Sequence, residues 1–201
     1  MLLVQNLCLY RSSVKIFDDV NLSLGSGKII ILKGKNGSGK TSLLKTILFL
    51  IQPSSGSIYW KSKIIKKSIY DFYNNLTFIG DKNTSIRQLT IAENIIIWKK
   101  IFLSKVGNEE INNILSILKL DNFKNKKINT LSLGQIKKLE LIRLIIENKR
   151  YWILDEPFTN LDTETIDIIA QSFEDHCKNE GSILFSTHQD VRFKMFEEIT
   201  L

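Results

Sequence analysis

The chain has 201 residues, of which 43% are hydrophobic and 24% charged, and its formal net charge is +7. This length favours one domain, and the hydrophobic content is enough for a packed core, which excludes a disordered chain. No apolar run approaches the ~20 residues of a membrane-spanning helix, and no basic region of a secretory signal opens the chain, so we expect a cytosolic protein.

In chain order, apolar runs predict strands and 3.6-residue patterns predict helices. Strands are predicted at residues 2–9, 21–24, 29–32, 57–60, 77–80, 151–154 and 182–188. Helices are predicted at residues 41–50 and 136–148, and a helical insertion at residues 81–130 contains two more. In this insertion Thr90 and Glu93 form a capping box. The pattern predicts an α/β fold in a single domain, residues 1–201, with an antiparallel β part and a helical subdomain.

The segment GKNGSGKT matches the phosphate-loop pattern G-x-x-x-x-G-K-[ST] between a predicted strand and a predicted helix. Its residues are Gly34, Lys35, Asn36, Gly37, Ser38, Gly39, Lys40 and Thr41. Glycines let backbone amides point at a polyphosphate, and the helix N-terminus adds a positive dipole end. Lys40 is expected to reach the β- and γ-phosphates and Thr41 to ligate Mg²⁺. The context disfavours a glycine-rich turn with a chance lysine, and the expected ligands are ATP and Mg²⁺.

Two acidic residues follow the continuous apolar run 151–154. Asp155 stands where open α/β sheets place ligands and is expected to hold Mg²⁺, whereas Glu156 points elsewhere and is expected to act as general base. Solvated acids at a strand end are the alternative, which the upstream phosphate loop disfavours.

The segment Leu131-Ser132-Leu133-Gly134-Gln135 precedes an amphipathic helix, with Ser132 as a plausible N-cap. The helix carries Leu139, Ile142, Ile145 and Ile146 on one face, and Lys137, Lys138, Glu140 and Glu147 largely away from it. The helix N-terminus is suited to an anion, although by itself this segment fits any capped helix equally well.

The order of these motifs, followed by Asn160-Leu161-Asp162 and then His188, resembles that of the ATP-binding cassette ATPases. The resemblance covers nearly the whole chain and implies a head-to-tail homodimer that encloses two ATP molecules. It implies that Ser132, Gly134 and Gln135 contact the γ-phosphate held by the partner's Lys40 and that Asp162 lies across the dimer seam. It further implies that His188 hydrogen-bonds the γ-phosphate and that Tyr10 stacks on adenine. Packing of Tyr10 within its strand is an open alternative.

One position departs from the family pattern. The family usually carries a glutamine at the end of the middle strand, where this chain has Gly80-Asp81-Lys82, and Gln88 comes several residues late. That glutamine touches Mg²⁺ and water in the family, so this contact falls to Asp81 or Lys82.

Local details resemble the CcmA group, the ATP-binding subunits of bacterial cytochrome c biogenesis (heme exporter) systems. They lie in residues 78–80, 89–94, 155–162 and 186–189. The resemblance implies a CcmB-like integral membrane partner and a peripheral position on the cytoplasmic face of the inner membrane. The alternatives are a transporter ATPase with another cargo, a cassette protein acting on ribosomes or DNA, and an inactive subunit.

Two lysine-rich segments, residues 61–67 and 124–127, account for part of the positive charge. Such segments are typical of solvated faces, but also of contacts with anionic lipids or nucleic acids. Because aromatic residues are not interleaved with these lysines, we interpret them as solvated and expect no nucleic-acid partner.

Overall fold

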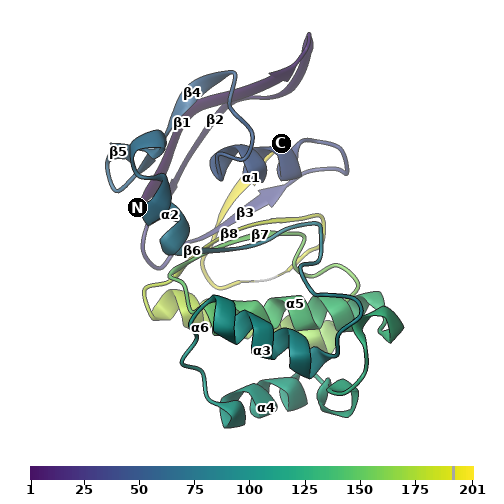
Figure 1. Cartoon of the computed structure of the whole chain (residues 1–201). Coiled ribbons are helices and arrows are strands. Elements are labelled where there is room, and N and C mark those ends of the chain that lie inside the picture. Colours follow the sequence, from purple (N-terminus) through teal and green to yellow (C-terminus); the bar gives the residue numbers. More distant parts are fainter. Residues whose placement is uncertain (192) are drawn as a thin grey trace.

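The strands form two separate sheets, which are stacked in Figure 1. The computed structural model describes residues 1–191 and 193–201. The antiparallel sheet has the order β2-β1-β4-β5 and contains β1 (Leu2–Arg11), β2 (Val14–Leu24), β4 (Ser55–Trp60) and β5 (Lys63–Ile64). The parallel sheet has the order β6-β7-β8-β3-β9 and contains β3 (Ile29–Lys33), β6 (Leu76–Ile79), β7 (Tyr151–Asp155), β8 (Ser182–Thr187) and β9 (Glu197–Thr200).

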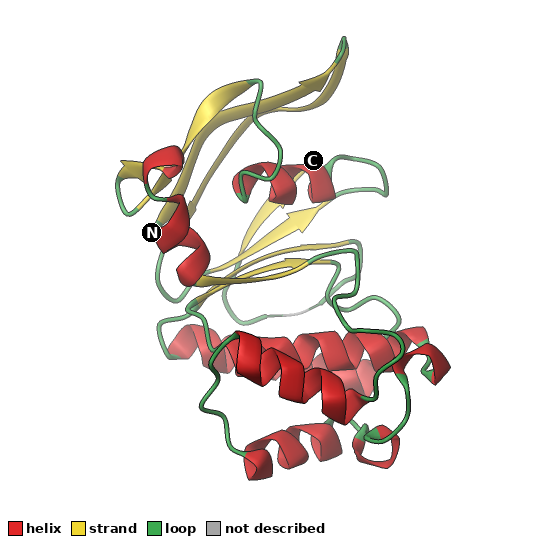
Figure 2. Cartoon of the chain, viewed as in Figure 1, coloured by secondary structure: helices red, strands yellow, loops and turns green. Residues whose placement is uncertain are grey.

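The helices lie on both sides of the parallel sheet (Figure 2). Helices α1 (Lys40–Ile47) and α2 (Ile69–Asn74) lie on the side of the antiparallel sheet. On the other side are α3 (Ile91–Ile101), α4 (Asn108–Ile117), α5 (Leu133–Glu147) and α6 (Thr163–Lys178). Coverage of both faces explains why β3 and β7 are nearly continuous apolar runs, and why all six residues of β8 are buried.

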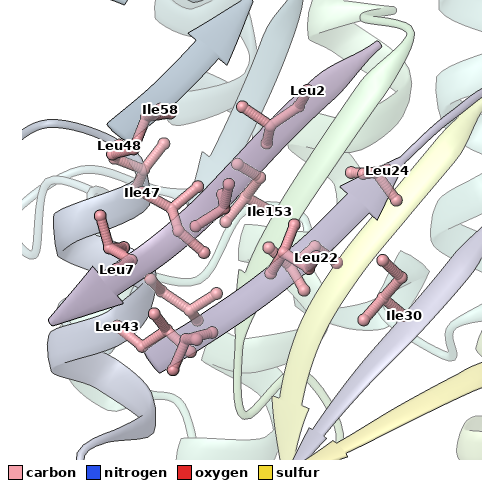
Figure 3. Packing of buried hydrophobic residues seen from close by; sticks show 14 of the residues in the cluster. Leu2, Leu7, Leu22, Leu24, Ile30, Leu43, Ile47, Leu48, Ile58 and Ile153 are labelled. Atoms are coloured by element: carbon pink, nitrogen blue, oxygen red, sulfur yellow. The ribbon is translucent and has the colours of Figure 1, made fainter. Parts of the chain in front are cut away.

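The largest core cluster fills the space between the two sheets (Figure 3). Leu43 and Ile47 of α1 belong to this cluster together with Leu7 of β1 and Ile30 of β3, and all four residues are fully buried. Truncating Leu43 to alanine would cost about 2–5 kcal/mol, because the lost contacts leave a cavity. This packing fixes α1, and with it the phosphate loop, against the end of β3.

Helix α5 is buried on more than one side. Leu141 and Leu144 belong to the core beneath the parallel sheet, whereas Leu139, Ile142 and Ile146 belong to the core shared with α3 and α4. The polar residues that we expected away from the apolar face are also largely inside: Lys138, Glu140 and Glu147 are all buried. The amphipathic pattern predicted the helix but not the buried environment of its polar side.

The predicted helix at residues 41–50 ends earlier, at Ile47. Phe49 has a left-handed backbone, φ 59°, and the amides of Leu50 and Ile51 both donate to the Lys45 carbonyl, at 2.9 and 3.2 Å. These bonds satisfy carbonyl groups at the helix end before Pro53 is reached. The predicted caps at Thr90 and Ser132 are both present as capping boxes.

Candidate functional site

The phosphate loop lies between β3 and α1. The ammonium of Lys40 is 6% exposed and donates to the carbonyls of Gly34 and Lys35, at 2.8 and 3.2 Å. Gly39 has φ 102°, and a Cβ there would meet the side chain and carbonyl of Ile16 at 3.0–3.1 Å. Glycine is therefore required at Gly39 both by its backbone conformation and by the close approach of β2.

Asp155 lies at the carboxyl end of β7, next to the phosphate loop. Its side chain accepts from the Thr41 hydroxyl at 2.6 Å and from the Ser186 hydroxyl at 2.5 Å, and the residue is only 2% exposed. Ser186 is its register partner on β8, so the parallel pairing of the two strands sets this contact. A hydroxyl and a carboxylate side by side are oxygen donors that suit Mg²⁺ completed by water and phosphate oxygens. No cluster of three His, Cys, Asp or Glu side chains that could hold a metal occurs in the described part of the chain.

Glu156 lies between two nitrogen groups from distant parts of the sequence. One carboxylate oxygen is 3.6 Å from Lys40 Nζ, and the other is 2.9 Å from His188 Nδ1. The backbone of Glu156 is left-handed, φ 48°, and its amide donates to the Ser186 hydroxyl at 3.0 Å. A left-handed backbone in a non-glycine residue carries strain, which is found most often at functional sites.

These groups line one open cavity of about 400 Å³. Its wall includes Thr41, Asp155, Glu156 and His188, which the sequence analysis had chosen. Asn36 of the phosphate loop lies there too. The structure thus brings together four predicted catalytic and metal-binding residues from β7, α1 and the end of β8.

The segment after β6 supplies Asp81 and Asn83 to the cavity wall, in the region of the missing glutamine. Lys82, the other candidate for that contact, is exposed. Asp81 pairs with Lys45 at 3.1 Å. Burial alone would raise the pKa of Asp81, but the hydrogen bond and charge of Lys45 outweigh burial and lower it. Sequence reasoning did not identify Asn83, whose only signal was its place shortly after a buried strand.

Lys137 is a second residue that sequence reasoning did not place in the site. It lies on α5, lines the cavity and is partly buried. Burial lowers the pKa of Lys137, and the carboxylates of Asp155, Glu140 and Glu156 act against that shift. Its helical spacing of four residues from Leu133, which also lines the cavity, was the available signal.

The remaining predicted residues have local structural partners. Ser132 caps α5 and forms a reciprocal capping box with Gln135. A Cβ on Gly134 would collide with the carbonyl of Asn160, so the tip of α5 packs directly against the loop after β7.

Asp162 is the N-cap of α6. It accepts from the amide and hydroxyl of Thr165, at 2.9 and 2.8 Å, and pairs with Lys138 at 3.3 Å. The Thr165 amide and hydroxyl, together with Lys138, lower the pKa of Asp162 to about 2.

Tyr10 lies near the end of β1 and is 42% exposed. Its register partner is Lys15, which neighbours the Ile16 that contacts Gly39. Tyr10 is not among the residues that line the described cavity. Its stacking on adenine therefore stays a prediction.

The family model described as ABC transporter matches residues 17–159, well over half of the chain. The chain therefore belongs to the ABC transporter family, as an ATP-binding cassette ATPase. Within that family it is similar to proteins named cytochrome c biogenesis ATP-binding export protein CcmA. The CcmA of Reclinomonas americana is 38% identical over 96% of this chain and 87% of its own length. The CcmA of Vibrio vulnificus (strain YJ016) is 33% identical over 95% of this chain and 93% of its own length. The predicted family and its CcmA-like character are confirmed.

Solved structures share the fold. A putative ABC transporter ATP-binding protein from Pyrococcus furiosus superimposes with a TM-score of 0.84 at 22% identity, covering 100% of this chain and 96% of that one. An ATP-binding cassette described as dimeric, in a post-hydrolysis state with ADP and Pi, has a TM-score of 0.74 at 22% identity, with coverage of 94% and 88%. The predicted fold class, an α/β cassette with antiparallel and helical parts, is confirmed.

Proposed function

We propose that this chain hydrolyses ATP with the residues assembled around Glu156, as the ATP-binding subunit of an export system in cytochrome c biogenesis. The main support for hydrolysis is the position of the Glu156 carboxylate, which lies 3.6 Å from Lys40 Nζ and 2.9 Å from His188 Nδ1. The hydrogen-bonded pair of Thr41 and Asp155 lies in the same site. The CcmA relatives, matched over most of their length, support the biological role.

In the proposed reaction Glu156 accepts the proton of the water that attacks the γ-phosphorus, while the bond from this phosphorus to the bridging oxygen breaks and ADP leaves. His188 holds the carboxylate in place through its 2.9 Å contact and stands ready to hydrogen-bond the γ-phosphate. Lys40 supplies positive charge to the phosphate oxygens, where charge develops during transfer. Thr41 and Asp155 would hold Mg²⁺, which supplies further charge stabilisation when bound.

Two variants separate binding from chemistry in this proposal. Glu156→Gln keeps the shape of the side chain but cannot take a proton, so phosphate release should fall by about 10²–10⁴ while ATP binding persists. Lys40→Ala should weaken ATP binding itself, because a buried cation that faces the phosphates is removed. Phosphate release and binding of a fluorescent ATP analogue measure both effects. Unchanged turnover in Glu156→Gln would contradict the assignment of the base.

The site is proposed to be completed by a second copy of the chain. Ser132, Gly134 and Gln135 lie at the start of α5, and Leu133 beside them is 66% exposed. An exposed helix N-terminus of this kind can contact an anion held by another subunit. Two copies would then enclose two ATP molecules, with Asp162 of each near the seam.

Export requires membrane-spanning partners. Among the described residues, no helix is long and apolar enough to cross a membrane. A CcmB-like integral membrane subunit is the partner that the CcmA likeness suggests, with this chain bound peripherally at the cytoplasmic face of the inner membrane. One ATPase domain, residues 1–201 with a helical subdomain at 81–130, would form the contact.

The partner is tested by affinity purification of Glu156→Gln protein from native membranes with Mg·ATP. Recovery of a small multi-span protein of cytochrome c maturation is expected. Recovery of a different permease would keep the ATPase mechanism but reject the proposed cargo. Ribosomes or DNA without a membrane protein would reject the transport role.

A further inference from the structure

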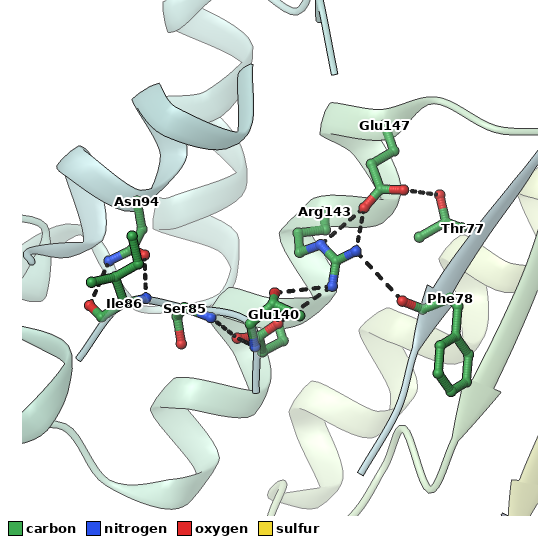
Figure 4. Close-up of polar contacts among 9 residues, drawn as sticks. Thr77, Phe78, Ser85, Ile86, Asn94, Glu140, Arg143 and Glu147 are labelled. Atoms are coloured by element: carbon green, nitrogen blue, oxygen red, sulfur yellow. Dashed lines mark hydrogen bonds and ion pairs between the residues drawn. The ribbon is translucent and has the colours of Figure 1, made fainter. Parts of the chain in front are cut away.

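Four charged residues form a stripe along α5 that leads away from the nucleotide cavity. Lys137, Glu140, Arg143 and Glu147 are spaced by three, three and four residues, so they lie on one side of the helix. Glu140, Arg143 and Glu147 are all buried, and alternating charges continue along the stripe. Figure 4 shows that this side of α5 faces β6 and the chain that follows it.

The far end of the stripe is attached to β6. The Thr77 hydroxyl donates to Glu147 at 2.9 Å, and Arg143 donates to the carbonyl of Phe78 at 3.5 Å. Arg143 also donates to Glu147 through two nitrogens, at 2.9 and 2.5 Å. These bonds fix the carboxyl end of β6 on α5.

The middle of the stripe is attached to the chain just beyond the cavity. Glu140 is 1% exposed, and one of its oxygens accepts from the amides of both Thr84 and Ser85, at 2.8 Å each. Its other oxygen accepts from the Thr84 hydroxyl at 2.8 Å. Arg143 donates to the same hydroxyl at 3.0 Å, which joins the two attachments.

Between the two attachments the chain is only a few residues long. This bridge, residues 79–83, contains Asp81 and Asn83, the two residues that line the cavity where the family places its glutamine. Both ends of the bridge are therefore held on the helix whose first turn carries Ser132 and Gly134. A buried carboxylate that accepts three hydrogen bonds holds the geometry of a loop firmly, because charge-assisted bonds are strong and fully satisfied buried networks are rigid.

We propose that Glu140 is a positioning residue for ATP hydrolysis, which holds Thr84 and Ser85 so that Asp81 and Asn83 face the Mg·ATP site. Through this bridge the start of α5 and the cavity wall move as one unit. The inference rests on the proposed hydrolysis at this site, but it assigns a role to a buried residue that does not touch the nucleotide cavity.

The test compares three variants on the same helix turn. In Glu140→Ala the two amides lose their acceptor, so turnover should fall by about 10–100-fold and the Mg²⁺ concentration for half-maximal rate should rise. Glu140→Gln keeps an oxygen that accepts from both amides and should recover most of the rate. Leu141→Ala, a matched control that is buried but faces the core beneath the sheet, should lower thermal stability without changing the Mg²⁺ dependence.

Hydrogen exchange supplies a readout that does not depend on activity. In Glu140→Ala the amides of Thr84 and Ser85 should exchange at least about ten times faster, while the amides of α5 keep their protection. ATP affinity in EDTA should change less than twofold, because the phosphate loop is untouched. If Glu140→Ala does not fold, Thr84→Val serves in its place, because it removes one of the three hydrogen bonds to Glu140. Its turnover should fall less than that expected for Glu140→Ala, and it should likewise need more Mg²⁺ for half-maximal rate.

The outcomes are distinguishable. Faster exchange at Thr84 and Ser85 with unchanged turnover and Mg²⁺ dependence would overturn the positioning role. Equal changes of turnover and Mg²⁺ dependence in Glu140→Ala and Leu141→Ala would also overturn the positioning role. Glu140 would then only stabilise the fold, as Leu141 does. Absence of turnover in the wild-type chain with its membrane partner would instead reject the proposed function itself.

Discussion

Replacing Arg143 by methionine should destabilise the protein strongly, because it breaks a buried ion pair. Its side chain is 9% exposed, and that of its partner Glu147 is 4% exposed. Methionine fills much of the volume but leaves two buried carboxylates, those of Glu147 and Glu140, without their cation. Breaking a buried ion pair in this way typically costs about 3–5 kcal/mol. For a chain of this size, that corresponds to a fall in Tm of about 6–20 °C.

A double-mutant cycle isolates the cause. Glu147→Gln removes one of the two carboxylate charges that Arg143→Met leaves without a cation, so the double variant should be more stable than Arg143→Met alone. Arg150→Met is the matched control, since its ion pair with Glu180 is exposed and should contribute about 0–1 kcal/mol. Urea unfolding followed by circular dichroism gives the free energies of unfolding of the four proteins in the cycle and of the control.

The pH dependence gives an independent check on Arg143→Met. Burial already raises the pKa of Glu147 above its ordinary value, and the charge of Arg143 opposes that shift. Removing the arginine raises this pKa further, so the folded variant takes up a proton at a higher pH than the unfolded chain does. The free energy of unfolding of Arg143→Met should therefore lie closest to the wild-type value near the ordinary pKa of a glutamate. The difference between the two proteins should grow as pH rises. A deficit below about 1 kcal/mol, or one that pH does not change, would refute the reasoning.

Two further predictions concern the loop that joins β7 to α6 and the tip of α5. Asp162→Ala should cost about 0.5–2 kcal/mol at pH 7 through loss of the α6 N-cap. Because the folded pKa of about 2 lies below the ordinary 3.8, thermal scans should show this deficit shrink as pH falls from 4 towards 2. Gly134→Ala should lower the rate of phosphate release, since its Cβ collides with the Asn160 carbonyl, whereas Gly107→Ala, which meets nothing within 4 Å, should leave the rate unchanged. Equal effects of the two alanines would contradict the packing argument.

The sequence predicted the parts of the site whose geometry is local. A strand, a glycine-rich turn and a helix suffice to position Lys40 and Thr41, and a buried strand suffices to deliver Asp155 and Glu156 to the sheet edge. The sequence had marked both β7 and β8 as strands, but their register, which brings Ser186 to Asp155, is seen only in the structure.

Contacts between segments distant in sequence could not be predicted in the same way. Helical periodicity located Glu140 and Glu147 on a polar side of α5, but it carried no information about the chain that covers that side. Thr84 and Ser85 approach from 55 or more residues away, and their amides bind Glu140 through backbone atoms that leave no sequence pattern. The place of Lys137 in the cavity wall had a local signal, its spacing of four residues from Leu133, but the cavity itself is formed by segments distant in sequence.

The central claim, that hydrolysis takes place at a site shared by two copies of this chain, is tested most directly by sedimentation of Glu156→Gln protein with Mg·ATP. Because this variant should bind ATP without consuming it, we predict a dimer with Mg·ATP and a monomer with ADP. Ser132→Arg, placed at the exposed start of α5, should abolish the dimer while leaving ATP binding intact. A monomer under all conditions, together with phosphate release by the wild-type chain at the same concentration, would contradict the account.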